Sequence, residues 1–215
     1  MFKKKPFFIV FEGVEGCGKS FQSKKLFHNL KKHKIDTILT REPGGTKSSE
    51  LIRNLILKDY FLKNNKDKFD KYTDTLLYLA ARNEHVKNKI KPALLKKKIV
   101  ICDRFTDSTL AYQVYGKKVK KNFINNIHKE ILSGVKPDLV FILRVSQSVS
   151  KKRLKKRKNK NRYDNFSPTF YSKAQKSFLK IAKNKKKYFI LDSSSNDKSV
   201  ENKIFNIVKK HINIE

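Results

Sequence analysis

The apolar residues of this chain gather into short continuous runs that are separated by longer, charged stretches. Five runs rich in Ile, Val and Phe lie at residues 7–11, 36–40, 98–102, 138–143 and 188–192. Within them the apolar residues do not alternate with polar ones, which is typical of parallel strands covered on both faces. We therefore predict five short, buried strands.

The stretches between these runs show helical spacing, as Leu51, Leu55 and Ile56 illustrate. Strands that alternate with helices favour an α/β three-layer fold, here a five-stranded parallel sheet surrounded by helices. The chain has 215 residues and no internal repeat, so we expect a single domain. The predicted helices cover residues 20–33, 46–58, 70–91, 120–132, 168–184 and 197–212.

Positive charge dominates the composition. The formal net charge is +33, and nine of the twelve residues at 151–162, KKRLKKRKNKNR, are Lys or Arg. This stretch is either an arm that binds nucleic acid or part of a site for a smaller anion. Lys is abundant together with Asn, Ile and Phe, which AT-rich codons favour, so compositional drift at tolerant surface positions also explains much of the excess. Net charge bears on solubility and non-specific association, not on the fold.

Cysteine usage and hydropathy exclude several classes of protein. The two cysteines, Cys17 and Cys102, lie far apart, which excludes a disulfide scaffold and argues against a metal cluster. The first apolar run spans about five residues, which is shorter than the apolar region of a signal peptide. No run approaches the roughly 20 apolar residues of a membrane span. We expect a cytoplasmic protein with no membrane partner.

The first predicted strand leads directly into GVEGCGKS, which matches the phosphate-loop (P-loop) motif G-x-x-x-x-G-K-[ST]. The context that this motif requires, a strand before it and a helix after it, is also predicted. Backbone N–H groups of such a loop bind phosphate oxygens, its Lys reaches the β- and γ-phosphates, and its Ser ligates Mg²⁺. The motif predicts a nucleoside triphosphate site formed by Gly13, Val14, Glu15, Gly16, Cys17, Gly18, Lys19 and Ser20.

Two further polar segments follow predicted strands. REPGGT at 41–46 follows the second strand and contributes Arg41, and DRFTDSTLAYQ at 103–113 follows the third and contributes Arg104. The carboxyl ends of parallel strands meet at one edge of a sheet, where α/β proteins bind ligands. Two arginines and a P-loop Lys at this edge indicate a crevice in which two phosphorylated molecules meet.

The motifs FEGVEGCGKS, REPGGT, LAAR at 79–82, KPAL at 91–94, DRFTDSTLAYQ and PDLVFIL together resemble the thymidylate kinase (dTMP kinase) family. Their order and spacing match along nearly the whole chain. The resemblance implies a single P-loop kinase domain over residues 1–215 that transfers the γ-phosphoryl of MgATP to dTMP. It also implies a mobile basic lid at about 150–164, a homodimer through helix faces, and no specific nucleic-acid partner.

The resemblance also assigns roles to the residues around the phosphates. Arg41 and Arg104 hold the dTMP phosphate, since the planar guanidinium grips phosphate bidentately. Asp103 supports Mg²⁺ together with Ser20, partly through water, and Glu15 faces the sugar 3′-OH. The residues expected to act in catalysis are Lys19, Arg104, Arg153 and Glu15.

The nucleoside part of dTMP is assigned in the same way. Tyr78 would stack on thymine, Arg82 would donate to the base O4, and Tyr112 would leave no room for a 2′-OH. Pro43 and Leu51 would form the wall near the 5-methyl group. The full set of expected dTMP contacts is Arg41, Pro43, Leu51, Tyr78, Arg82, Arg104, Ser108, Thr109, Tyr112 and Gln113.

In relatives that lack an Arg in the P-loop, as this chain does, basic lid residues bind the ATP phosphates. Arg153, Arg157 and Arg162 fall on such positions. Arg144 and Asn161 depart from the family pattern, where acidic residues are usual. Two alternatives remain: another nucleoside monophosphate kinase, or a P-loop ATPase that binds nucleic acid through the basic stretch. The stretch lacks the interleaved aromatic residues that single-strand binders use for stacking.

Overall fold

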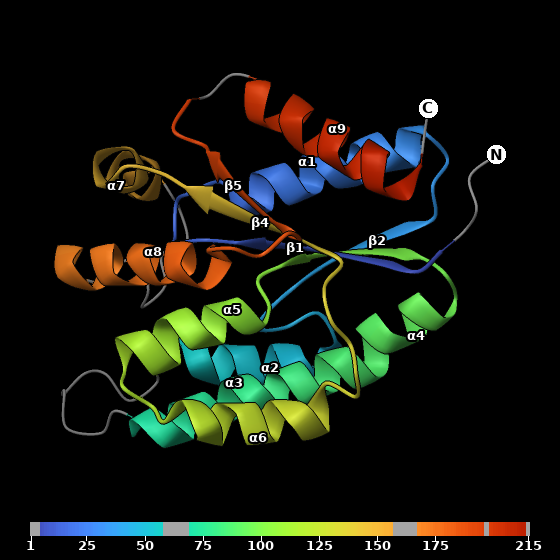
Figure 1. The fold of residues 1–215 in the computed structure, drawn as a ribbon. Helices are drawn as coiled ribbons and strands as arrows, with labels where there is room; N and C mark the ends of the chain where they lie inside the picture. The colour runs from blue at the N-terminus through green and yellow to red at the C-terminus, as the bar shows by residue number, and fades with distance from the viewer. Residues whose placement is uncertain (1–4, 58–68, 157–166, 196–197, 214–215) are drawn as a thin grey trace.

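A five-stranded parallel sheet forms the centre of the computed structural model, which describes residues 5–57, 69–156, 167–195 and 198–213 (Figure 1). The strand order is β2-β3-β1-β4-β5, so β1 lies in the middle and pairs with β3 and β4. The predicted five-stranded α/β fold is confirmed. The strands are β1 (Phe7–Glu12), β2 (Thr37–Arg41), β3 (Ile99–Asp103), β4 (Leu139–Arg144) and β5 (Tyr188–Asp192).

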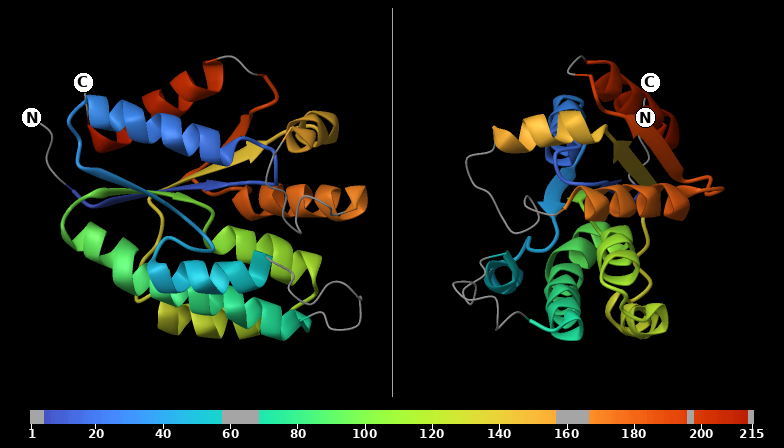
Figure 2. Two further views of the ribbon diagram at one scale, coloured as in Figure 1. Left: turned by 180° about the vertical axis from the view of Figure 1, so that it is seen from behind. Right: turned by 90° about the vertical axis from the view of Figure 1, so that its left-hand side faces the viewer.

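Helices cover both faces of the sheet and complete three layers. They are α1 (Lys19–Lys32), α2 (Lys47–Leu57), α3 (Lys71–His85), α4 (Lys91–Leu95), α5 (Thr106–Thr109), α6 (Lys121–Ile131), α7 (Gln147–Lys155), α8 (Pro168–Ala182) and α9 (Ser199–Ile212). α1 and α9 pack together on one face, whereas α8 contacts β4 and β5 from the other. Figure 2 shows α2 to α6 on the same side as α8. None of the helices in the described part of the chain is long and apolar enough to cross a membrane.

The apolar runs form strands because their side chains are buried between these helix layers. Phe11 and Phe141 on neighbouring strands stack at 5.2 Å between ring centroids, and Phe8 meets Phe105 edge-on at 5.0 Å. β5 differs from the prediction of a strand covered on both faces. It lies at the edge of the sheet, and Ile190 is 44% exposed.

The helix predicted over residues 70–91 is longer and less regular than the sequence indicated. It begins with α3, passes through a π-helical turn η1 (Val86–Ile90), and ends with α4. Pro92 lies in the first turn of α4. Proline has no N–H, so Pro92 cannot donate the hydrogen bond to residue i−4 that a continuous α-helix requires. The wider π-helical turn lies directly before this position.

Most of the segment DRFTDSTLAYQ is helical, which the sequence did not predict. Its first residue, Asp103, ends β3, and from Thr106 the segment forms the short helix α5 and then a second π-helical turn, η2 (Leu110–Gly116). π-Helical turns are frequent at functional sites, because the extra residue per turn redirects side chains. Here the turn carries Tyr112 and Gln113, and both line the cavity described next.

Candidate active site

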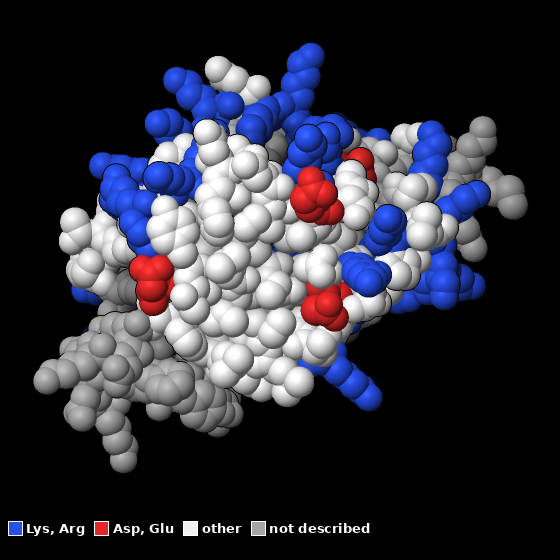
Figure 3. All heavy atoms as spheres, turned by 90° about the horizontal axis from the view of Figure 1, so that it is seen from below, with Lys and Arg blue, Asp and Glu red and all other residues white. Residues whose placement is uncertain are grey.

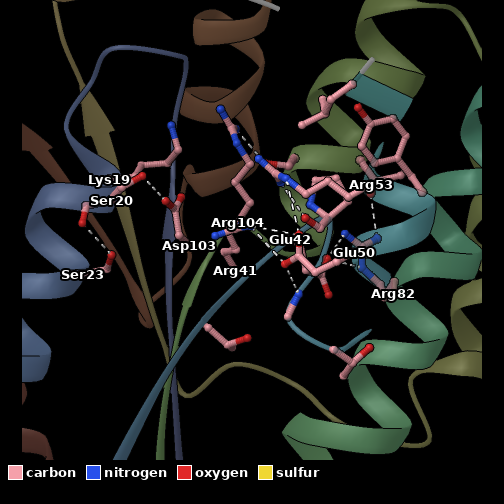
Figure 4. A pocket seen from close by; sticks show the side chains of 18 of the residues that line it. Lys19, Ser20, Ser23, Arg41, Glu42, Glu50, Arg53, Arg82, Asp103 and Arg104 are labelled. Carbon is pink, nitrogen blue, oxygen red and sulfur yellow. Dashed lines mark hydrogen bonds and ion pairs between the residues drawn. The ribbon is translucent and has the colours of Figure 1, made fainter. Parts of the chain in front are cut away.

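A cavity of about 940 Å³ lies at the carboxyl ends of β1, β2 and β3. Figure 4 shows the P-loop side chains Lys19 and Ser20 on one side of it and Glu50, Arg53 and Arg82 on the other. The cavity brings together most of the side chains predicted for the site. Those lining it are Glu15, Lys19, Ser20, Arg41, Pro43, Tyr78, Arg82, Asp103, Arg104, Ser108, Thr109, Tyr112 and Gln113.

The P-loop connects β1 to α1. Its Lys19 is 6% exposed, and its ammonium group donates to the carbonyl of Val14 at 2.7 Å. Gly13 can only be glycine, because its φ is +136° and a Cβ would lie 2.4 Å from the carbonyl oxygen of Leu143. The end of β4 therefore packs directly on the start of the loop.

Arg104 joins the P-loop to the segment after β3. Its backbone is left-handed, with φ 74°, which costs roughly 1–2 kcal/mol for a residue other than glycine. Its guanidinium donates to Glu15 at 2.7 Å, to the Gly13 carbonyl at 2.9 Å and to Ser108 at 3.1 Å. Tyr112 donates to the other oxygen of the Glu15 carboxylate at 2.7 Å. The left-handed backbone of Arg104 thus holds its guanidinium, which is predicted to bind a phosphate, against the carboxylate of Glu15 in the P-loop.

Glu12 is a buried acid beside this site that sequence reasoning missed. It accepts hydrogen bonds from the N–H of Phe105 at 2.8 Å and from the N–H and hydroxyl of Ser108 at 3.1 and 2.5 Å. Burial, together with the negative charge of Asp107, raises the pKa of Glu12 to about 8. A charged residue type at the end of an apolar strand was the signal available in the sequence. Its structural consequence is that α5 starts at a fixed place beside the P-loop.

Arg82 lies at the other end of the cavity in a buried polar network. It contacts Glu42 through Nη2 at 2.6 Å and through Nε at 2.8 Å. Its remaining contacts are the Thr109 hydroxyl at 2.7 Å, His128 Nε2 at 2.8 Å and the Phe105 carbonyl at 2.9 Å. Each nitrogen of the guanidinium that was expected to read thymine O4 therefore has an acceptor within the protein.

The charges in this network are fixed by mutual contact. Burial raises the pKa of Glu42, but the positive charge of Arg82 and the hydrogen bond from His85 outweigh it, so the pKa is lowered. Burial and the charge of Arg82 lower the pKa of His128 to about 3. His128 is therefore a neutral acceptor, and Glu42 is the anion that balances Arg82.

The REPGGT loop is held by a second acid, Glu50 of α2. Arg41 donates to both of its carboxylate oxygens at 3.0 and 3.1 Å, and the N–H of Gly45 donates at 2.9 Å. Arg53, also from α2, donates to the Pro43 carbonyl at 2.6 Å and lines the cavity. Burial and the nearby charge of Arg41 lower the pKa of Arg53. Arg53, the one Arg of α2, was missed, because helical spacing alone does not show which face of that helix borders the cavity.

Some predicted residues lie outside this cavity. Leu51 was expected at the wall near the 5-methyl group, but its side chain is 70% exposed and does not line the cavity. Leu57, two turns further along α2, lines it instead. Arg153 contacts backbone carbonyls behind the P-loop, including that of Gly16 at 3.3 Å. Arg157 and Arg162 lie outside the described residues.

The fold and the site together define a class of protein. A P-loop binds the phosphates of a nucleoside triphosphate, and here it shares one cavity with Arg41, Arg53 and Arg104. Such a site is that of a P-loop kinase whose acceptor is itself a phosphorylated molecule.

Comparison with known proteins identifies the family. The family model for thymidylate kinase matches residues 11–204. A thymidylate kinase from Aster yellows witches'-broom phytoplasma (strain AYWB) is 40% identical over 209 residues, covering 95% of this chain and 96% of the relative. One from Wolbachia pipientis wMel is 43% identical over 178 residues, covering 81% and 84%. The crystal structure of a thymidylate kinase from Ehrlichia chaffeensis superposes with a TM-score of 0.72 at 31% identity, covering 97% of this chain and 99% of that one. The chain belongs to the thymidylate kinase family.

Proposed function

We infer that the protein transfers the γ-phosphoryl group of ATP to dTMP, giving dTDP and ADP. The observation that carries this conclusion is that Lys19 of the P-loop, Arg104 and Arg41 line one and the same cavity. The nucleophile is already a phosphate oxygen, so the reaction needs no strong general base. Positioning and charge neutralisation supply the catalysis.

Arg104 is proposed to hold the dTMP phosphate, and its bond to Glu15 ties that phosphate to the P-loop. Arg41 and Arg53 extend the same positive surface. Because Arg41 donates to both carboxylate oxygens of Glu50, a phosphate must compete with this carboxylate for the Arg41 guanidinium.

The base and sugar contacts are proposals as well. Tyr78 is proposed to stack on thymine and Tyr112 to exclude a 2′-OH. Gln113 Nε2 is buried without a hydrogen-bond partner among the described residues, which suits a donor to the base. Arg82 would contact O4 by sharing an N–H that already has a protein acceptor. The remaining proposed contacts are Pro43, Ser108 and Thr109.

Mg²⁺ is part of the proposal. The Ser20 hydroxyl donates to Asp103, and Asp103 Oδ1 is buried with no hydrogen-bond partner in the described part of the chain. Oxygen donors of this kind suit Mg²⁺, which is usually held by one or two protein oxygens and by substrate phosphates. When bound, the ion neutralises charge on the phosphates during transfer.

The lid of residues 150–164 remains a proposal, as does the use of Arg157 and Arg162 for ATP phosphates. The first part of this segment, up to Lys155, belongs to helix α7. Arg153 donates to the carbonyls of Ser193 at 2.8 Å and Gly16 at 3.3 Å. These contacts favour a role in holding the P-loop over the direct role in catalysis that the sequence suggested.

A homodimer is also proposed. The face formed by α2, α3 and α6 has a broad centre free of charged residues, with Lys, Arg and a few acidic side chains around it (Figure 3). Three exposed leucines lie on α2 and α3: Leu51, Leu55 and Leu76, which are 70%, 45% and 47% exposed. An exposed apolar face of this kind fits a second copy of the chain. A cytoplasmic location and the absence of a specific nucleic-acid partner stay predictions.

The proposed function is tested by a coupled ADP-release assay with dTMP, dUMP, dCMP, dGMP and AMP as acceptors. We expect dTMP to be the best acceptor and DNA to have no effect on turnover. A preference for another monophosphate would assign a different kinase of the same class. ATP hydrolysis stimulated by DNA, with no acceptor specificity, would instead indicate a nucleic-acid-dependent ATPase.

A further inference from the structure

Three successive carbonyls of the P-loop accept hydrogen bonds from side chains far along the chain. The Glu15 carbonyl accepts from Tyr171 of α8 and from Ser150 of α7, the latter at 2.9 Å. The next carbonyl, of Gly16, accepts from Arg153 at 3.3 Å. The third, of Cys17, accepts from Ser193, which follows β5, at 2.7 Å. The back of the loop is therefore held by α7, α8 and the segment after β5.

The contact with α7 is close as well as polar. Ser150 is 2% exposed, and its hydroxyl oxygen lies 3.0 Å from the hydroxyl oxygen of Tyr171. Gly16 has a φ of +71°, and a Cβ on it would lie 2.9 Å from the Ser150 hydroxyl and 3.0 Å from the Ser150 carbonyl oxygen. Any side chain at Gly16 would push α7 away, so the loop and the helix are packed to fit one another.

Glu15 is held at both of its ends. Its carboxylate accepts from Arg104 and Tyr112, each at 2.7 Å, on the side where the phosphate acceptor binds. Its carbonyl accepts from Ser150 of α7 and Tyr171 of α8 on the other side. We propose that Tyr171 and Ser150 are positioning residues for phosphoryl transfer, which fix the Glu15 peptide so that the P-loop N–H groups face the ATP phosphates.

The physical argument follows from the planarity of the peptide unit. Holding a carbonyl fixes the N–H of the same peptide on the opposite side, and a phosphate-binding loop works by aiming successive N–H groups at one anion. A buried carbonyl left without a donor costs roughly 1–3 kcal/mol. While at least one of the two hydroxyls is present, a rotated Glu15 peptide would lose its donor and incur this cost. Without either hydroxyl the carbonyl is unpaired in the native orientation too, so that orientation is no longer favoured.

The test uses three variants of the full-length chain. Tyr171→Phe and Ser150→Ala each remove one hydroxyl, and the double variant removes both donors to the Glu15 carbonyl. Tyr115→Phe is the matched control, because Tyr115 is a half-buried tyrosine on η2 whose ring lies 5.7 Å from the ammonium of Lys180. The measurements are kcat and KM for ATP and dTMP, and the affinities of MgADP and dTMP by calorimetry.

We expect each single variant to weaken MgADP binding about threefold, because one donor remains. The double variant should weaken it about 100-fold, well beyond the product of the single effects, since the buried carbonyl then has neither donor. The affinity for dTMP and the control variant should change by less than twofold. The same pattern is expected in kcat/KM for ATP.

Three results would overturn the inference. They are a double effect no larger than the product of the single effects, an equal loss of dTMP and MgADP affinity, and a Tyr171→Phe variant within twofold of wild type. If the double variant does not fold, the Tyr171→Phe result alone tests the inference. The kinetic part rests on the proposed function. A wild-type protein that fails to phosphorylate dTMP would refute that function, whereas the MgADP titration would still test the positioning role.

Discussion

Glu42→Gln tests how much of the site depends on one buried ion pair. Glu42 and Arg82 approach to 2.6 Å, and their side chains are 4% and 3% exposed. The substitution keeps the shape of the side chain and its carbonyl oxygen but removes the charge. Arg82 would then be a buried cation without its balancing anion, next to a neutral His128.

The expected loss follows from this burial. Removing one partner of a buried ion pair costs about 3–5 kcal/mol, because the other charge stays buried and unpaired. At an m-value of about 2 kcal/mol/M in urea, the unfolding midpoint should fall by about 2 M. The matched control is Glu50→Gln, since Arg41 and Glu50 are 54% and 37% exposed and also meet at 3.0 Å. Surface pairs of this kind are worth about 0–1 kcal/mol.

The assay is urea unfolding of both variants and wild type at several pH values. The folded-state pKa of Glu42 lies below its unfolded value of 4.5, so its contribution is present above pH 4.5 and is lost as the pH falls through the folded pKa. The difference between wild type and Glu42→Gln should therefore shrink in acid. A loss below 1 kcal/mol at pH 7, or equal losses in the two variants, would refute the reasoning.

Three further predictions concern activity and pH. Lys19→Ala and Arg104→Ala should each lower kcat/KM by about 10²–10³-fold, because each removes a charge aimed at the transferring group, and near-normal turnover in either would contradict the assigned roles. In competition assays kcat/KM for dUMP should be about 10–200-fold lower than for dTMP, which is the effect of one methyl group. For dCMP it should be lower by more than about 10³-fold, because a site that hydrogen-bonds to the base rejects a mismatched one. Equal kcat/KM values for dTMP and dCMP would show that the site does not read the base. The raised pKa of Glu12 means that the folded protein keeps a proton that the unfolded chain loses, so stability should fall by up to about 5 kcal/mol as pH rises from 4.5 to 8. Glu12→Gln should flatten this dependence in urea titrations, and an unchanged slope would argue against it.

The fold was predictable because each strand is a continuous apolar run and each connection has helical spacing. The prediction was wrong in detail where a tertiary contact decided the local structure. β5 is half exposed and lies at the edge of the sheet. The helical form of residues 106–116 depends on Glu12, which accepts hydrogen bonds from the N–H groups of Phe105 and Ser108. The sequence shows a charged residue at the end of an apolar strand, but it does not show which groups that residue contacts.

The site was predictable where a motif fixes the chemistry, as for Lys19 and Arg104. Leu51 does not line the cavity, because helix α2 turns that position outward, and the sequence did not single out Arg53 on the same helix. Family membership and dTMP kinase activity were predicted correctly from the combined motifs, as the comparisons show. The individual ligand contacts remain predictions, because they depend on the bound substrates.

The attachment of the P-loop to Ser150, Tyr171 and Ser193 has a consequence for how the enzyme is made. β1 and the P-loop leave the ribosome before β3 and β4, so β1 has no neighbouring strand on either side until these have been synthesised. The P-loop carbonyl of Cys17 gains its hydrogen-bond donor, Ser193, only after the segment that follows β5 has been synthesised. A nascent chain that ends before that point should carry the complete nucleotide motif and still bind ATP poorly. Its exposed apolar strands would depend on protection from aggregation during this interval.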